Sequence, residues 1–235
     1  MSAIFLFLAV VAVIAGWWLA QQRLMAKPWL EEGALGEFPG SGAPSVPAAA
    51  IGLGVFLAVV GSLFALLISA YSTRMSFSDV PPLPAPRLLW LNTGVLVLSS
   101  AALQWAAISA KQGELDRVRI GLFLGALLAL AFLAGQFLAW RRLAAAGYFL
   151  TGNPASAFFY LITGVHGLHL AGGIAALGRS AARVWSDRIQ GGELRLGLGL
   201  CAAYWHFLLA LWLVLFAVLT SGGDDFLAIC RSLAE

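Results

Sequence analysis

Three histidines are the residues of this 235-residue chain whose type and spacing could support chemistry. His166 and His169 lie three positions apart and so share one face of a helix, while His206 follows Tyr204 and Trp205. Three imidazoles could bind copper or zinc, and two could ligate a haem. The competing interpretation is that neutral imidazoles link neighbouring helices by hydrogen bonds. We favour it, because the His-x-x-His spacing alone is a weak metal signal and no acidic or thiolate partner is expected at the same depth.

The elements that position these histidines are long apolar stretches. The chain is 61% hydrophobic and 11% charged, against about 45–50% and 25% in soluble domains. Stretches of roughly 20 residues can cross a membrane as helices, whereas barrel strands alternate over about 10 residues. The sequence therefore predicts an all-α, polytopic transmembrane helix bundle of about six spans. The six stretches are 3–20, 48–71, 88–109, 120–140, 155–178 and 196–220.

Three segments follow from this pattern. Residues 1–47 are predicted to form an N-terminal membrane anchor helix and a flexible Pro/Gly linker, residues 48–220 a five-helix bundle, and residues 221–235 an acidic outer tail. The first stretch lacks a positive region before it and ends in Trp17-Trp18 followed by Arg23 and Lys27, so we interpret it as a retained anchor and not a signal peptide. The two cysteines are too few for a thiolate metal centre or a disulfide framework.

Positive charge predicts the orientation, because cytoplasmic loops of membrane proteins carry more Lys and Arg. Nine of the 14 basic residues fall on one side and five on the other, so both termini are expected outside. The richer side holds Arg23, Lys27, Lys111, Arg117, Arg119, Arg179, Arg183, Arg188 and Arg195. The other side holds Arg74, Arg87, Arg141, Arg142 and Arg231.

The middle of each span contains packing residues instead of charges. No Asp, Glu, Lys or Arg lies there, which argues against a pump or an ion-coupled transporter. Small residues at helical spacing, which let helix backbones approach closely, predict tight packing. The glycines of this kind are Gly61, Gly121, Gly125, Gly164 and Gly167. Neutral polar residues are expected to add hydrogen bonds between helices, and they are Thr93, Ser100, Gln104 and Gln136.

Several motifs carry a family resemblance. The run from Phe158 to His169, FFYLITGVHGLH, resembles the signature of haem–copper (cytochrome c) oxidase subunit III, and so does Tyr204-Trp205-His206-Phe207 with Trp212 after it. The resemblance covers roughly residues 51–216 in the family's order. Its weaker parts are Asn92-Thr93, Ser99-Ser100, Gly135-Gln136, Trp140, Gly147 and Asn153-Pro154.

The resemblance implies a non-redox accessory membrane subunit of an aerobic respiratory oxidase. Subunit I, with subunit II in the same complex, would hold the haem and copper, reduce O2 to water and pump protons. This chain would hold no metal or redox cofactor and no catalytic residue. It would lie in a bacterial inner (cytoplasmic) membrane, contact the membrane lipids and bind phospholipid at most. Three family carboxylates are replaced, so roles that rest on them, including contributions to proton uptake, are not carried over. They correspond to Val60, Ala139 and Leu209.

The resemblance leads to one hypothesis about the site and leaves alternatives open. His166, His169, Trp205 and His206 are expected to form a structural polar cluster between helices, with close backbone packing at Gly164 and Gly167. The close alternative is an accessory subunit of a nitric oxide reductase or a quinol oxidase. An alternative of another class is a stand-alone bis-histidine haem or copper membrane protein.

Overall fold

The computed structural model describes residues 47–75, 88–185 and 192–220, which form five long helices. In chain order they are α2 (Ala48–Met75), α3 (Leu88–Gln112), α4 (Leu115–Ala145), α5 (Pro154–Trp185) and α6 (Gly192–Thr220). All five are long and apolar enough to cross a membrane, and the described residues contain no strand. The expected span 3–20 and the tail 221–235 lie outside the described residues.

The helices are longer than the apolar stretches that predict them. α4, for example, begins at Leu115 and ends at Ala145, so it includes Asp116 near its start and Arg142 in its last turn. Charged residues mark where the hydrocarbon layer ends, but a helix can continue through the polar interface beyond it. Stretches bounded by charge therefore underestimate the ends of the helices.

Two connections between helices depend on glycine. At the end of α3, the amide of Glu114 donates to the carbonyl of Ser109 and the amide of Gly113 to that of Ala110, and Gly113 has φ +80°. Gly147 after α4 has φ +88°, and the same pattern recurs there. The amide of Tyr148 donates to the carbonyl of Leu143, and the amide of Gly147 donates to that of Ala144. Both are Schellman caps, which place a residue in the left-handed region where glycine is favoured.

α5 begins at a side-chain cap. The Asn153 side-chain oxygen accepts a hydrogen bond from the amide of Ala155 at 3.0 Å, and Pro154 occupies the first helical position. Asn is among the preferred N-cap residues, and Pro is favoured at the first position because its missing amide hydrogen is not needed there. The motif therefore fixes where the histidine-bearing helix starts.

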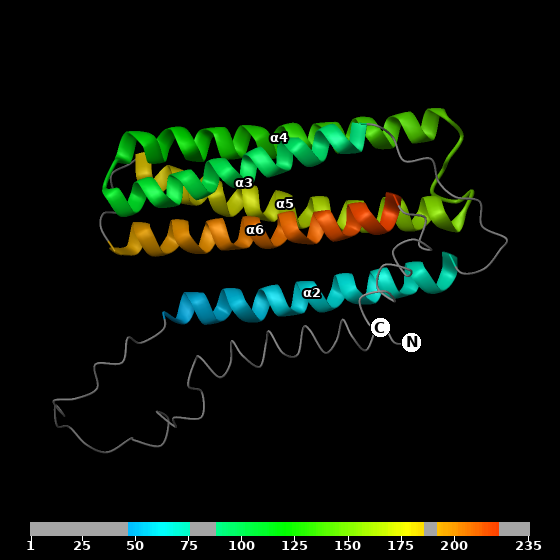
Figure 1. Cartoon of the computed structure of the whole chain (residues 1–235), viewed down its shortest axis with the longest axis horizontal. Coiled ribbons are helices and arrows are strands. Elements are labelled where there is room, and N and C mark those ends of the chain that lie inside the picture. The colour runs from blue at the N-terminus through cyan, green and yellow to red at the C-terminus, as the bar shows by residue number, and fades with distance from the viewer. Residues whose placement is uncertain (1–46, 76–87, 186–191, 221–235) are drawn as a thin grey trace, which may run out of the picture.

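The five helices lie side by side, with α2 along one side of the bundle and α4 on the other (Figure 1). Contact between α3 and α4 is the most extensive of any pair. The main core fills the space between α3, α4, α5 and α6 and includes fully buried Phe132, Trp205 and Trp212. A smaller core joins α2 to α5 and α6 through Val60, Phe64 and their neighbours. The functional candidates therefore lie in a four-helix block with a fifth helix against it.

The ends of the helices also show where the basic residues collect. The α3–α4 connection and the end of α5 lie at the same end of the bundle as the start of α6 (Figure 1). That end includes basic residues near the α3–α4 connection, which are Lys111, Arg117 and Arg119. It also includes those near the end of α5 and the start of α6, which are Arg179, Arg183 and Arg195. Which side of the membrane this end faces stays a prediction.

Candidate functional site

His206 joins α6 to α3 through both of its ring nitrogens. Nε2 lies 3.0 Å from Oε1 of Gln104, and Nδ1 lies 2.6 Å from Oγ of Ser100. A side-chain amide oxygen can only accept, so Nε2 donates to Gln104, and Nδ1 shares a hydrogen bond with the Ser100 hydroxyl. Both nitrogens of the imidazole are therefore engaged by α3.

Two tryptophans of α6 extend the same contact. The indole N–H of Trp205 donates to Oγ of Ser99 at 3.1 Å, and the Ser99 hydroxyl donates onward to the carbonyl of Gly125 at 2.8 Å. The indole N–H of Trp212 donates to Oγ1 of Thr93 at 2.9 Å. Ser99 thus relays hydrogen bonds across three helices. The expectation that Thr93, Ser100 and Gln104 bond to another helix is confirmed.

His166 is placed differently from the other histidines. It is completely buried, and neither of its ring nitrogens has a hydrogen-bond partner among the described residues. Aromatic rings from three helices surround it, with the Trp212 ring 5.1 Å away and those of Phe132 and Phe64 at 5.9 and 6.4 Å. The hypothesis of a hydrogen bond between helices at His166 is wrong here, because the facing helices present rings at its level.

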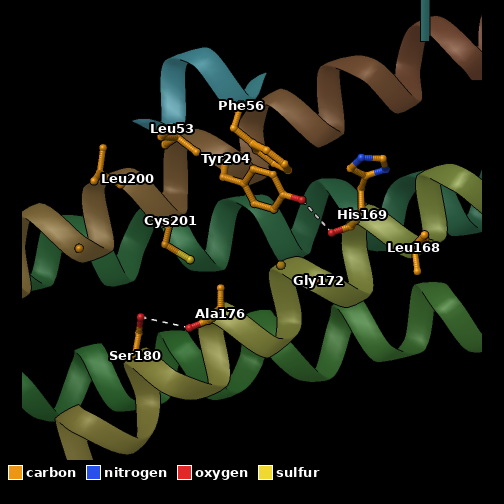
Figure 2. Close-up of a pocket in the computed structure, with 12 residues that line it drawn as sticks. Leu53, Phe56, Leu168, His169, Gly172, Ala176, Ser180, Leu200, Cys201 and Tyr204 are labelled. Carbon is orange, nitrogen blue, oxygen red and sulfur yellow. Dashed lines mark hydrogen bonds between the residues drawn. The ribbon is translucent and has the colours of Figure 1, made fainter. Parts of the chain in front are cut away.

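His169 also departs from the expected role. Its Nδ1 lies 2.8 Å from the carbonyl oxygen of Val165, so the ring donates to its own helix and not to a neighbour. Its ring packs against Phe56 and Phe64 of α2 at 6.4 and 5.7 Å. The bond between helices at this level is made by its backbone, whose carbonyl accepts from the Tyr204 hydroxyl at 2.7 Å, as Figure 2 shows.

A groove of about 540 Å³ opens beside His169. Leu53 and Phe56 of α2, Leu168 and Gly172 of α5, and Cys201 and Tyr204 of α6 lie around it (Figure 2). Most of these side chains are apolar, and the Tyr204 hydroxyl is engaged by the backbone carbonyl of His169 (Figure 2). The groove is therefore suited to an apolar occupant.

Sequence reasoning missed the polar contacts between α4 and α5. The Trp140 indole donates to Oγ1 of Thr163 at 3.0 Å, and the Tyr160 hydroxyl lies 3.2 Å from the Trp140 carbonyl and 3.0 Å from that of Tyr148. An aromatic residue carrying one polar atom inside a span was the available signal. Gln136 was expected to bond across helices, but its buried amide has no partner among the described residues.

The expected glycine contacts differ in closeness. A Cβ built on Gly125 would lie 2.6 Å from Leu103, which is an overlap, so α3 and α4 meet closely there. A Cβ on Gly164 or Gly167 would lie 3.6 Å from Trp140 or Leu133, an ordinary contact, and one on Gly61 would lie 3.8 Å from Phe207. Of these four positions, only at Gly125 would an added Cβ force a neighbouring side chain, that of Leu103, to move.

The three histidines do not converge on one point. His166 lies in the core among rings, whereas the His206 side chain lies on the outer surface between α3 and α6. Among the residues that the structure describes, no three His, Cys, Asp or Glu side chains come close enough to hold a metal ion. The geometry is that of helix contacts with the histidines distributed among them.

Comparison with known proteins gives a consistent result. The family profile described as "Cytochrome c oxidase subunit III" matches residues 51–223. A cytochrome c oxidase subunit 3 of Thermostichus vulcanus is 30% identical over 176 residues, which are 72% of this chain and 85% of the relative. A probable subunit 3 of Mycobacterium tuberculosis is 29% identical over 67% of this chain and 77% of its own length. A subunit 3 of Yarrowia lipolytica is 29% identical over 72% of this chain and 66% of its own length.

Proposed function

Because the chain belongs to the cytochrome c oxidase subunit III family, we propose that it is the non-redox accessory subunit of an aerobic respiratory haem–copper terminal oxidase. Its own contribution is structural. It adds a block of helices beside the catalytic subunit and stabilises the assembled complex, and the reaction takes place elsewhere. The family match over residues 51–223 is the observation that carries this proposal.

The contents of the spans support a structural role. Their middle parts carry no Asp, Glu, Lys or Arg, so they offer no ionisable relay of the kind that proton-moving proteins use. Both nitrogens of His206 are engaged by α3, and His166 is enclosed by rings. Neither side chain is arranged toward an open coordination position. We propose that the chain holds no haem or copper of its own.

The partners follow from the same proposal. Subunit I would hold the haem and copper, reduce O2 and pump protons, and subunit II would belong to the same complex. The membrane would be the bacterial inner membrane. The apolar groove between α2, α5 and α6 would hold a phospholipid acyl chain, because its lining is mostly apolar and Phe56 and Leu168 are exposed there.

Copurification tests the proposal. The full chain is tagged at either end, expressed in its own cells and purified in mild detergent. Mass spectrometry should identify the catalytic subunit, the absorption spectrum should show haem, and the preparation should consume O2 with a reduced electron donor. The same purification of an unrelated tagged inner-membrane protein is the control for oxidase that copurifies nonspecifically.

Other results would replace the proposal. Reduction of nitric oxide with no reduction of O2 would favour a nitric oxide reductase subunit. A haem spectrum or stoichiometric copper in a preparation containing only this chain would favour a stand-alone redox protein.

A further inference from the structure

Two polar side chains inside the four-helix block have no hydrogen-bond partner. His166 on α5 is completely buried, and Gln136 on α4 is 3% exposed. Neither ring nitrogen of His166 and neither amide atom of Gln136 has a partner among the described residues. Burial of a polar group without a hydrogen bond is costly, and such groups in native proteins bond to protein or to ordered water. These four atoms therefore need a partner that the described side chains do not supply.

The packing of α4 on α5 brings the two side chains to the same level. The ring of Phe132 lies 5.9 Å from that of His166, and the indole N–H of Trp140 donates to Oγ1 of Thr163 at 3.0 Å. Gln136 lies four residues after Phe132 and four before Trp140, so it shares their face of α4. Gln136 therefore meets α5 between the levels of Thr163 and His166, within about one helical turn of His166.

The other polar side chains near this level have partners of their own. Thr163 accepts from the Trp140 indole and donates to a carbonyl of its own helix. The side-chain nitrogen of Asn92 on α3 donates to a carbonyl of α4 at 3.3 Å. His166 and Gln136 are left to each other, but no hydrogen bond joins them directly. Polar groups that lie together beyond hydrogen-bond distance are commonly bridged by water.

The contact between α4 and α5 is also looser at this level than the contact between α3 and α4. The nearest atom to a Cβ built on Gly164 belongs to Trp140, and the nearest to one on Gly167 belongs to Leu133, both at 3.6 Å. On the α3 side of α4, a Cβ on Gly125 would lie 2.6 Å from its nearest neighbour. The side chains between α4 and α5 can therefore adjust around a small bound molecule more easily than those between α3 and α4.

We infer that one water molecule is bound inside the four-helix block and joins Gln136 to His166 by hydrogen bonds. Burial limits the occupant, because another helix or a lipid chain cannot reach side chains that are 3% exposed or less. Water both donates and accepts, so it fits either tautomer of the imidazole and either end of the amide. A metal ion fits less well, since no group of three His, Cys, Asp or Glu side chains occurs among the described residues.

A cryo-EM map that resolves ordered water tests the site directly. The full chain is imaged with the subunits that copurify with it. Density for one water is expected within hydrogen-bond distance of an amide atom of Gln136 and a ring nitrogen of His166. A direct bond between the two side chains would overturn the inference, and so would a map that shows ordered water elsewhere in the bundle but none between them. Neither result depends on which subunits are present, so the proposed function is tested separately.

A double-mutant cycle tests whether the two side chains are linked. In a dodecyl sulfate titration of the full chain, Gln136→Met and His166→Phe should each lower the equilibrium constant for folding about fivefold or more, because each leaves the remaining buried group short of a partner. The double variant removes both polar groups, so its loss should be smaller than the product of the two single losses.

Gln112→Met is the matched control for the cycle, because Gln112 is exposed and ends α3. Its effect should multiply with that of His166→Phe, as is usual for independent sites. If the losses from Gln136→Met and His166→Phe also multiply, the link between the two side chains is overturned.

Discussion

Replacing Gly121 with alanine should separate α3 from α4. A Cβ at this position would lie 2.8 Å from Cβ of Ala106 and 3.1 Å from its Cα and from the carbonyl oxygen of Ala102. Carbon atoms in favourable contact are about 3.5–4.0 Å apart, so the overlap is about 0.7–1.2 Å. Main-chain atoms cannot rotate away, and the two helices must therefore move apart.

The expected size of the effect follows from that movement. A gap of about 0.5–1 Å removes a quarter to a half of each dispersion contact along the interface. Overpacking of this kind typically costs about 1–3 kcal/mol, which is a factor of about 5 to about 150 in the unfolding equilibrium. Contact between α3 and α4 is the most extensive in the bundle, so the loss should extend to the close approach at Gly125.

Gly61→Ala is the matched control, and dodecyl sulfate titration of the full chain in mixed micelles is the assay. A Cβ at position 61 would meet only Phe207, at 3.8 Å, which is ordinary contact. Both substitutions replace a glycine within a helix, so their backbone effects are similar. Tryptophan fluorescence should show that the Gly121 variant unfolds at a lower midpoint concentration of dodecyl sulfate than the Gly61 variant does. If its midpoint equals or exceeds that of the Gly61 variant, the close approach of α3 and α4 is refuted.

Three further predictions concern other contacts. Ser99→Ala should lower the free energy of unfolding by about 1–2 kcal/mol, since Trp205 loses its acceptor and the carbonyl of Gly125 loses the Ser99 donor. The control is Ser62→Ala, which should change little in the same titration because the Ser62 hydroxyl bonds its own helix. Equal effects of the two substitutions would contradict the relay through Ser99. His166→Phe should leave the haem and copper content of the purified complex unchanged, because a phenyl ring fits among the rings around it; metal analysis showing the loss of one haem or copper would make His166 a ligand. A single cysteine replacing Ser186 should react with an impermeant maleimide only after intact cells are opened; labelling of intact cells would reverse the orientation.

The sequence was sufficient for the elements because they depend on local properties. Apolar runs and their charged ends located all five described helices, and the pair Asn153-Pro154 and Gly113 stand at helix ends where their backbone preferences require them. The face of α3 that carries Thr93, Ser100 and Gln104 was also predictable from helical spacing. It contacts α6 through the three expected side chains.

The roles of individual histidines were not predictable because they depend on the facing helices. His166 and His169 share one face, yet one ring is enclosed by Phe132 and Trp212 and the other bonds the carbonyl of Val165. Spacing tells which residues point together, but not which residues of another helix meet them. Gln136 illustrates the same limit, since its position late in α4 suggested a partner that the described residues do not supply.

The contacts of α2 differ in kind from those that join α3, α4, α5 and α6. Phe56 and Phe64 meet α5 and α6 through rings, whereas the bonds at Ser99, Thr163 and His206 are directional. A hydrogen bond weakens steeply when its angle falls below about 120°, but ring contacts change gradually with rotation. We therefore expect α2 to move more easily than the helices of the four-helix block move against one another. Leu53 and Phe56 form the α2 wall of the groove, so its width can follow a change in membrane thickness or lipid without breaking any of these bonds.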